Sequence, residues 1–145
     1  MIIVEAAKNP IKIKRDIYKY NGISYINNEA NVDESVIKKA LSNKAIINDF
    51  LKKANKIIED RYNEYIQNNW SKLPPSVDEV KKAATIKSAI IDYNGSDKDH
   101  YQLTLLLYGV SDKFFNNRGS VEGHYILNKD GSLFKIDDVY FDGSD

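Results

Sequence analysis

The chain has 145 residues, no cysteine, and 21 basic against 21 acidic side chains. The absence of cysteine excludes disulfide bonds, thiolate metal sites and cysteine nucleophiles, and the balanced charge gives no overall field that would favour nucleic acid. A chain of this length is expected to form a single domain over 1–145 and to bury roughly 70% of the surface that it exposes when unfolded.

The N-terminal sequence and the hydropathy predict no membrane contact. Residues 1–5 contain no basic stretch and no apolar run of the kind found in a signal peptide. The longest unbroken apolar run is Leu105-Leu-Leu-Tyr108, far shorter than a membrane-spanning helix. We therefore expect a cytoplasmic location.

Charge is distributed unevenly along the chain. Residues 1–85 contain 15 basic and 11 acidic side chains, whereas residues 86–145 contain 6 basic and 10 acidic ones. Chance scatter is one explanation. The other is that the C-terminal half presents an acidic face.

The first predicted elements are strands. Ile11, Ile13 and Arg15 alternate with Lys12, Lys14 and Asp16, a period of two that is typical of a half-buried strand. Asn21-Gly22 is a strong hairpin signal, because both residues tolerate a positive φ. We predict a β-hairpin over 11–27, beside which a strand over 2–6 can lie.

The next segment has a helical period. From Asp33 to Asn69 apolar residues recur every three or four positions. A single helix of this span would be roughly 55 Å long, whereas a globule of this size is only roughly 38 Å across. We therefore predict a break near Ser42-Asn43, with one helix over 33–41 and a longer one over 44–69.

A short helix is predicted after a proline-rich stop. Leu73-Pro74-Pro75 ends the helical segment, because proline cannot continue a helix and restricts the residue before it. Ser76 and Glu79 then have the spacing of a capping box, in which each side chain can bond to the backbone amide of the other residue. This pattern predicts a helix over 76–84.

The remainder of the chain predicts an antiparallel β-meander. A strand begins at Ile86 and is followed by a polar turn over 94–99, a central strand over 101–108 and a loop over 109–120. Strands over 124–128 and 133–136 then form a hairpin around Asn128–Gly131, and a segment over 139–141 adds an edge. The predicted fold class is α+β: an N-terminal β-hairpin, a helical middle made of a broken long helix and a short helix, and a C-terminal antiparallel β-meander packed on the helices.

Little in the sequence points to catalysis. His100 follows Asp97 and Asp99 in the predicted turn, and these three residues supply at most part of a metal site. Glu122 and His124 fall on one face of a strand, about 7 Å apart along it, so acid–base chemistry is conceivable there. A polar pair at a sheet edge is the simpler interpretation. We predict no catalytic residue, no metal and no cofactor, and hence that the protein is not an enzyme.

The ten tyrosines do not by themselves indicate a nucleic-acid site. A stacking platform for single-stranded nucleic acid needs lysine or arginine on the same sheet, and the predicted C-terminal strands carry more acidic than basic residues. Strand propensity and core packing explain most of the tyrosines. A few exposed ones would suit a protein-binding surface.

The order of elements resembles that of a family of small, largely uncharacterised bacterial proteins. The segments that carry the resemblance are Leu103-Thr-Leu-Leu-Leu-Tyr-Gly109 and Val121-Glu-Gly-His-Tyr-Ile-Leu-Asn-Lys-Asp-Gly131, within a likeness that covers roughly 10–141. In that family a strand is followed by a Glu-His-Gly-type turn, a strand and a glycine-containing hairpin. Here the order is Glu122-Gly123-His124, and Phe114-Phe-Asn-Asn117 stands where the family has Trp-Asp.

Members of this family resemble immunity proteins encoded beside polymorphic or contact-dependent toxins. The resemblance therefore implies a cytosolic protein that binds a toxin domain, such as a nuclease, and occludes its active site. Since the contact surfaces of such pairs diverge quickly, no binding residue is carried over by position. Candidate contacts come instead from the acidic C-terminal half, which can match a basic surface, and from its tyrosines: Asp92, Tyr93, Asp97, Asp99, Asp112, Glu122, Asp137, Asp138, Tyr140 and Asp142.

Three other interpretations stay open. In the first, the protein is a small-molecule-binding α+β domain with an apolar pocket between sheet and helices. In the second, it is an enzyme that uses Glu122 and His124. In the third, it has a general interaction role, which includes binding single-stranded nucleic acid.

Overall fold

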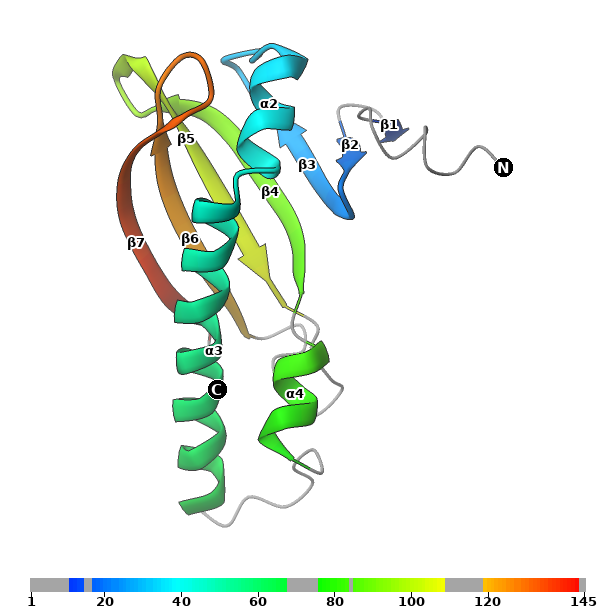
Figure 1. The fold of residues 1–145 in the computed structure, drawn as a ribbon, viewed down its shortest axis with the longest axis vertical. Helices are drawn as coiled ribbons and strands as arrows, with labels where there is room; N and C mark the ends of the chain where they lie inside the picture. Colours follow the sequence, from blue (N-terminus) through cyan, green and yellow to red (C-terminus); the bar gives the residue numbers. More distant parts are fainter. Residues whose placement is uncertain (1–10, 15–16, 68–75, 84, 109–118, 144–145) are drawn as a thin grey trace.

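A mixed β-sheet forms the centre of the molecule. The computed structural model describes residues 11–14, 17–67, 76–83, 85–108 and 119–143 (Figure 1). Within these residues the sheet has seven strands, in the order β1-β2-β3-β4-β5-β6-β7. Their bounds are β1 Ile11–Lys14, β2 Ile17–Tyr20, β3 Ile23–Asn27, β4 Ile86–Asn94, β5 Asp97–Leu107, β6 Gly119–Leu127 and β7 Leu133–Gly143. Neighbouring strands are antiparallel except β3 and β4, which are parallel.

The chain passes from β3 to β4 through helices α2 (Glu34–Leu41), α3 (Lys44–Gln67) and α4 (Val77–Ala83). Helices α2 and α3 run across one face of the sheet, and α4 lies beside the second half of α3 (Figure 1). Lys81 of α4 and Glu59 of α3 form an ion pair with 2.7 Å between Nζ and Oε2. No helix in the described part of the chain is long and apolar enough to cross a membrane.

The break between α2 and α3 has a local cause. The side-chain Oδ1 of Asn43 accepts hydrogen bonds from the backbone N–H groups of Ala45, at 2.9 Å, and of Ile46, at 3.4 Å. Asn43 therefore caps the N-terminus of α3, since it satisfies amides that have no partner inside the helix. The predicted break and both flanking helices are confirmed up to Gln67.

The core lies between helices α2 and α3 and the near face of the sheet. The buried helix residues recur mostly every three or four positions, and the least exposed residues of β5 and β6 are the odd-numbered ones, although Thr104 and Ile126 on the other face are also buried. The core residues of these elements are Ile37, Ala40, Leu41, Ile46, Phe50, Ala54, Ile58 and Tyr62 from the helices and Leu103, Leu105, Leu107, Val121, Tyr125 and Leu127 from β5 and β6. The odd-numbered residues of β5 and β6 thus face the helices.

Helix α3 packs closely on β6 at Gly123. A Cβ atom on Gly123 would lie 2.5 Å from Cδ1 of Phe50 and 2.9 Å from its Cε1. Two residues along the strand, the Tyr125 hydroxyl donates a 2.8 Å hydrogen bond to Asp49 of α3. Burial, together with this bond to a carboxylate, raises the pKa of Tyr125. A ring packed over a glycine and a partly buried hydrogen bond therefore hold the helix on this strand.

The α+β class is confirmed, but the division into a separate N-terminal hairpin and a C-terminal meander is wrong. The parallel pairing of β3 with β4, from Ser24 opposite Ser88 to Asn27 opposite Ile91, joins both parts into one sheet. Hydrophobic periodicity identifies a strand from its own residues and contains no information about a partner 60 positions away. The joining of the two parts was therefore missed.

Several local predictions also differ. The polar turn predicted over 94–99 is shorter, because β4 continues to Asn94 and β5 begins at Asp97, with Gly95 at φ 60° between them. The segments predicted over 133–136 and 139–141 are one strand, β7, whose register shifts at Asp137. The strand over 2–6, the stop at 73–75 and residues 109–118 of the predicted loop lie outside the described residues, whereas Gly119 and Ser120 belong to β6.

The contact between Phe50 and Gly123 can be tested by adding one methyl group. We expect Gly123→Ala to lower the free energy of unfolding by about 1–3 kcal/mol, because Phe50 is fully buried and has little room to move. Urea denaturation measures this value. Phe50→Leu should partly relieve the strain, so the double variant should lose less than the two single losses added together. Strictly additive losses would contradict the contact.

Candidate functional site

The sheet face that points away from α2 and α3 carries the even-numbered side chains of β5 and β6. Because Gly123 and Tyr125 face α3, the alternation of a strand turns Glu122 and His124 to the other side. The register then aligns Leu106, Glu122 and Tyr140 in one row and Thr104, His124 and Asp138 in the next. We call the surface made by Gln102, Thr104, Leu106, Glu122, His124, Asp138, Tyr140 and Asp142 the distal face.

A hydrogen-bond network centred on His124 lies on the distal face. The Nε2 of His124 is 2.7 Å from Oε2 of Glu122, and its Nδ1 is 2.8 Å from Nε2 of Gln102 and 3.4 Å from the Thr104 hydroxyl. The Tyr140 hydroxyl donates to the same Glu122 oxygen at 2.5 Å. The Gln102 amide also donates to Thr104, at 3.3 Å. The predicted pairing of Glu122 with His124 on one face of a strand is thus confirmed.

The network defines which ring nitrogen of His124 donates. Since the amide N–H groups of Gln102 can only donate, Nδ1 accepts, and Nε2–H donates to Glu122. Both nitrogens are therefore engaged by neighbouring side chains, which hold the imidazole in place. In the described residues, no group of three or more histidine, aspartate or glutamate side chains has a geometry that could hold a metal ion.

Tyr140 shares the distal face with three acidic residues, Glu122, Asp138 and Asp142. Its ring stacks on the imidazole of His124, with 5.7 Å between centroids and 5° between planes. The hydrogen bond to Glu122, followed by burial and by the charges of Glu122, Asp142 and Asp138, raises the pKa of Tyr140 to about 12. Tyr140, which is 36% exposed, thus lies beside the Glu122 carboxylate and between Asp138 and Asp142 along its own strand. This is a compact acidic and aromatic surface.

The structure brings together only some of the ten predicted contact residues. Glu122, Asp138, Tyr140 and Asp142 share the distal face of β6 and β7. Asp137 is exposed at the register shift of β7. Asp112 lies outside the described residues.

Asp97 and Asp99 lie at the other end of the sheet. Leu106 of β5 pairs with Glu122, and Asp99 lies seven residues before Leu106 on the same strand. Asp99 and Leu106 are therefore roughly 23 Å apart along the extended strand. The Asp97 carboxylate accepts from His100 at 2.9 Å and from the Asp99 amide at 2.9 Å, and these bonds lower the pKa of Asp97. The ring of His100 also stacks on Phe134, 4.1 Å away. This group is therefore a second cluster, distinct from the distal face.

Asp92 and Tyr93 have structural contacts. Asp92 accepts hydrogen bonds from the side chain of Asn28, from the amide of Ala30 and from the amide of Tyr93, all within 3.0 Å. It therefore fixes the loop that follows β3. Tyr93 lies beside Tyr101, with 6.0 Å between ring centroids, on the face that Asp92 does not share.

Gln102 and Thr104 are site residues that sequence reasoning missed. Both alternate with buried leucines along β5, so their direction is predictable. Their contact with His124 depends on the register of β5 against β6, in which Thr104 pairs with His124 and Gln102 with Ile126. Alternation within one strand does not set that register.

Comparisons with models of known protein families, with curated proteins and with solved structures find no match to this chain. The resemblance to immunity proteins therefore remains a prediction from the sequence.

The raised pKa of Tyr140 gives a direct test of the network. Because the folded-state pKa lies above the ordinary value of 10.0, the stabilisation from Tyr140 is complete below about pH 10 and is lost as the pH rises through about 12. We expect Glu122→Gln to move the pKa of Tyr140 back toward 10, since its largest cause is the bond to that carboxylate. NMR titration of the tyrosine Cζ resonance measures it, with Tyr140→Phe to assign the signal. An unchanged pKa in Glu122→Gln would refute this account.

The loop contacts of Asp92 predict a loss of stability. We expect Asp92→Ala to lower the free energy of unfolding by about 1–3 kcal/mol, because it leaves the partly buried amides of Ala30 and Tyr93 without this acceptor. Denaturation monitored by circular dichroism measures this loss. Asp99→Ala, which changes an exposed carboxylate on β5, is the matched control and should have little effect. Equal losses in the two variants would contradict the structural role of Asp92.

Proposed function

We propose that this chain is an immunity protein: it binds a bacterial toxin domain through its distal face and occludes it. The observation that carries the proposal is that the acidic residues Glu122, Asp138 and Asp142 share the distal face with the partly exposed Tyr140, whose hydroxyl donates to Glu122. The resemblance of Val121–Gly131 to immunity proteins supports the choice of a toxin as partner. In such a system the protein would act in the cytoplasm of the cell that it protects.

The chemistry of the distal face favours a basic partner. Asp138 and Asp142 are exposed, and Glu122 is about one-fifth exposed. Arginine on a partner can stack on a tyrosine ring and form paired hydrogen bonds with a carboxylate, so a surface with both groups suits it. Toxin domains that act on nucleic acid need basic surfaces, because their substrate is a polyanion. A protein that covers such a surface with carboxylates would keep the nucleic acid out.

The network also prepares the face for binding. Glu122 is held by His124 and Tyr140, and His124 is held in turn by Gln102. Side chains that are already ordered lose less conformational entropy when a partner binds. His124 thus supports recognition by holding Glu122 in place, and both of its own ring nitrogens are engaged by other side chains.

Co-expression tests the proposal. The partner to use is the C-terminal domain of the toxin candidate encoded next to this chain. We expect the chain to restore growth of cells that express this domain and to elute with it from a sizing column. Asp138→Lys should weaken the complex roughly tenfold or more, because it places a cation against a basic surface. Asp78→Lys on α4 is the matched control, since Asp78 is also exposed but lies on a helix.

The outcomes test separately whether the chain neutralises the toxin domain and whether the distal face is the contact surface. If no complex forms and growth is not restored, the chain is not an immunity protein for that domain. If a complex forms but Asp138→Lys and Asp78→Lys weaken it equally, the distal face is not the contact surface. Association should also slow as salt is added, because steering between opposite charges is screened.

A further inference from the structure

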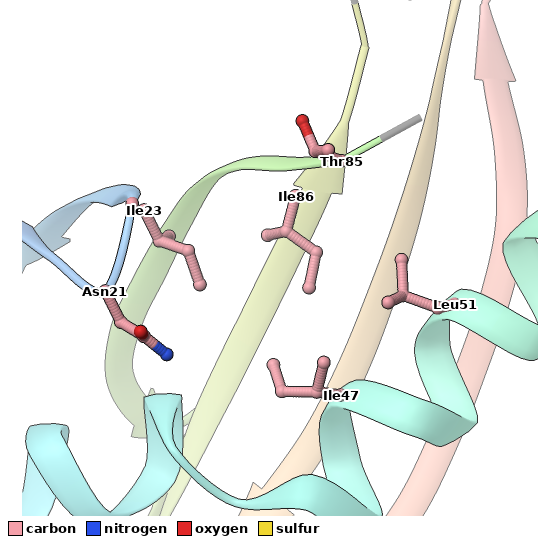
Figure 2. A pocket seen from close by; sticks show the side chains of 7 residues that line it. Asn21, Ile23, Ile47, Leu51, Thr85 and Ile86 are labelled. Carbon is pink, nitrogen blue, oxygen red and sulfur yellow. The ribbon is translucent and has the colours of Figure 1, made fainter. Parts of the chain in front are cut away.

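A cavity of about 460 Å³ opens between the sheet and α3, on the side opposite the distal face. Four aliphatic side chains form most of its wall: Ile23 from β3, Ile47 and Leu51 from α3, and Ile86 from β4. Figure 2 shows these four side chains directed into one common space. Asn21, Gly22 and Thr85 complete the described lining.

The local backbone explains why space is left here. Ile47 and Leu51 are one helical turn apart on α3, so they form one side of the cavity together. Gly22, at φ 78°, has no side chain, and an added Cβ there would meet no heavy atom within 4 Å. The register of β4 against β5 shifts between Ile86 and Ser88. The cavity thus lies where the β2–β3 turn, an irregular strand and α3 diverge.

The lining defines the kind of molecule that would fit. None of the seven described lining residues is charged, and an unpaired charge in such a place would be costly. Ile23 is almost fully buried, whereas Ile47, Leu51 and Ile86 are half-buried and contact the core. A cavity of this size and composition lies within the range of small-molecule sites.

Asn21 supplies one polar group at the rim. Its side-chain N–H₂ donates to the backbone carbonyl of Leu41 at 3.3 Å, which fixes the orientation of the carboxamide. Among the described residues, no hydrogen bond reaches the Oδ1 of the same group. An oriented acceptor beside four aliphatic side chains favours a ligand with one donor on an apolar body.

We propose that this cavity binds a small, neutral, mostly apolar molecule that donates one hydrogen bond to Oδ1 of Asn21. The site is independent of the proposed contact with a toxin, because it lies on the helix side of the sheet. Its ligand is defined by shape and by one donor.

Two neutral probes, indole and 2-naphthol, test the site. Each is titrated into the full chain while the methyl resonances of Ile23, Ile47, Leu51 and Ile86 are followed by NMR. We expect saturable shifts for at least one probe, with a dissociation constant below about 1 mM. The 1-methyl derivative of indole and the methyl ether of 2-naphthol lack the donor and should bind several-fold more weakly. Indole-3-acetate, which is charged, should not bind.

Variants that fill the cavity test whether the probes bind there, and the same change at an exposed position is the control. Ile47→Phe should weaken probe binding at least tenfold, whereas Ile136→Phe, the same change at an exposed position on β7, should have no effect. Leu51→Phe fills the cavity from the next turn of α3 and replaces Ile47→Phe if that variant does not fold. Asp138→Lys should leave probe binding unchanged. A failure of the probes to bind can therefore be distinguished from a failure of the chain to bind a toxin domain.

Two results would overturn the proposal. One is the absence of saturable shifts at the four methyl groups with either probe. The other is probe binding that the folded cavity-filling variant leaves unchanged, since that would show partition of the probe onto some other apolar surface.

Discussion

The arrangement of the molecule depends on the contact between Phe50 of α3 and Gly123 of β6. The ring occupies the position that a side chain on Gly123 would fill, so the helix can lie close to the strand only at a glycine. Because a strand alternates its side chains, Glu122 and His124 on either side of that glycine must point away from the helix. One packing contact therefore fixes the position of α3 and the direction of the two central residues of the distal face.

The acidic residues of β7 can serve either to protect an edge of the sheet or to bind a partner. The stacked pair of Tyr140 and His124 distinguishes these two roles. β7 forms one edge of the described sheet, and charged side chains on an edge discourage association with another strand. Asp137, which lies at the register shift, fits that role by itself. Edge protection does not require a tyrosine stacked on a histidine and bonded to a glutamate, as Tyr140 is. The ordered aromatic and acidic cluster is thus the stronger argument for recognition.

Local signals in the sequence predict local structure well here. The length of the helical segment, compared with the size of the globule, predicts the break between α2 and α3 near Ser42-Asn43, and Asn21-Gly22 predicts the β2–β3 turn, where both residues have positive φ. Alternation also predicts that Glu122 and His124 share a face. The parallel pairing of β3 with β4 and the contact of Gln102 with His124 depend on register between distant segments. That information lies in the packing of the whole chain, and no short window of sequence contains it.

The cavity is a further consequence of how α3 is seated. Successive residues of a helix are rotated by about 100°, so once Phe50 points at β6, Leu51 must point to one side of it. Ile47, one turn earlier, lies on the same side. This side of α3 faces β3 and the start of β4, where Gly22 and the register shift after Ile86 leave the space unfilled. The helix therefore packs tightly along one stripe and leaves an adjacent apolar stripe only half-buried, beside the oriented carboxamide of Asn21.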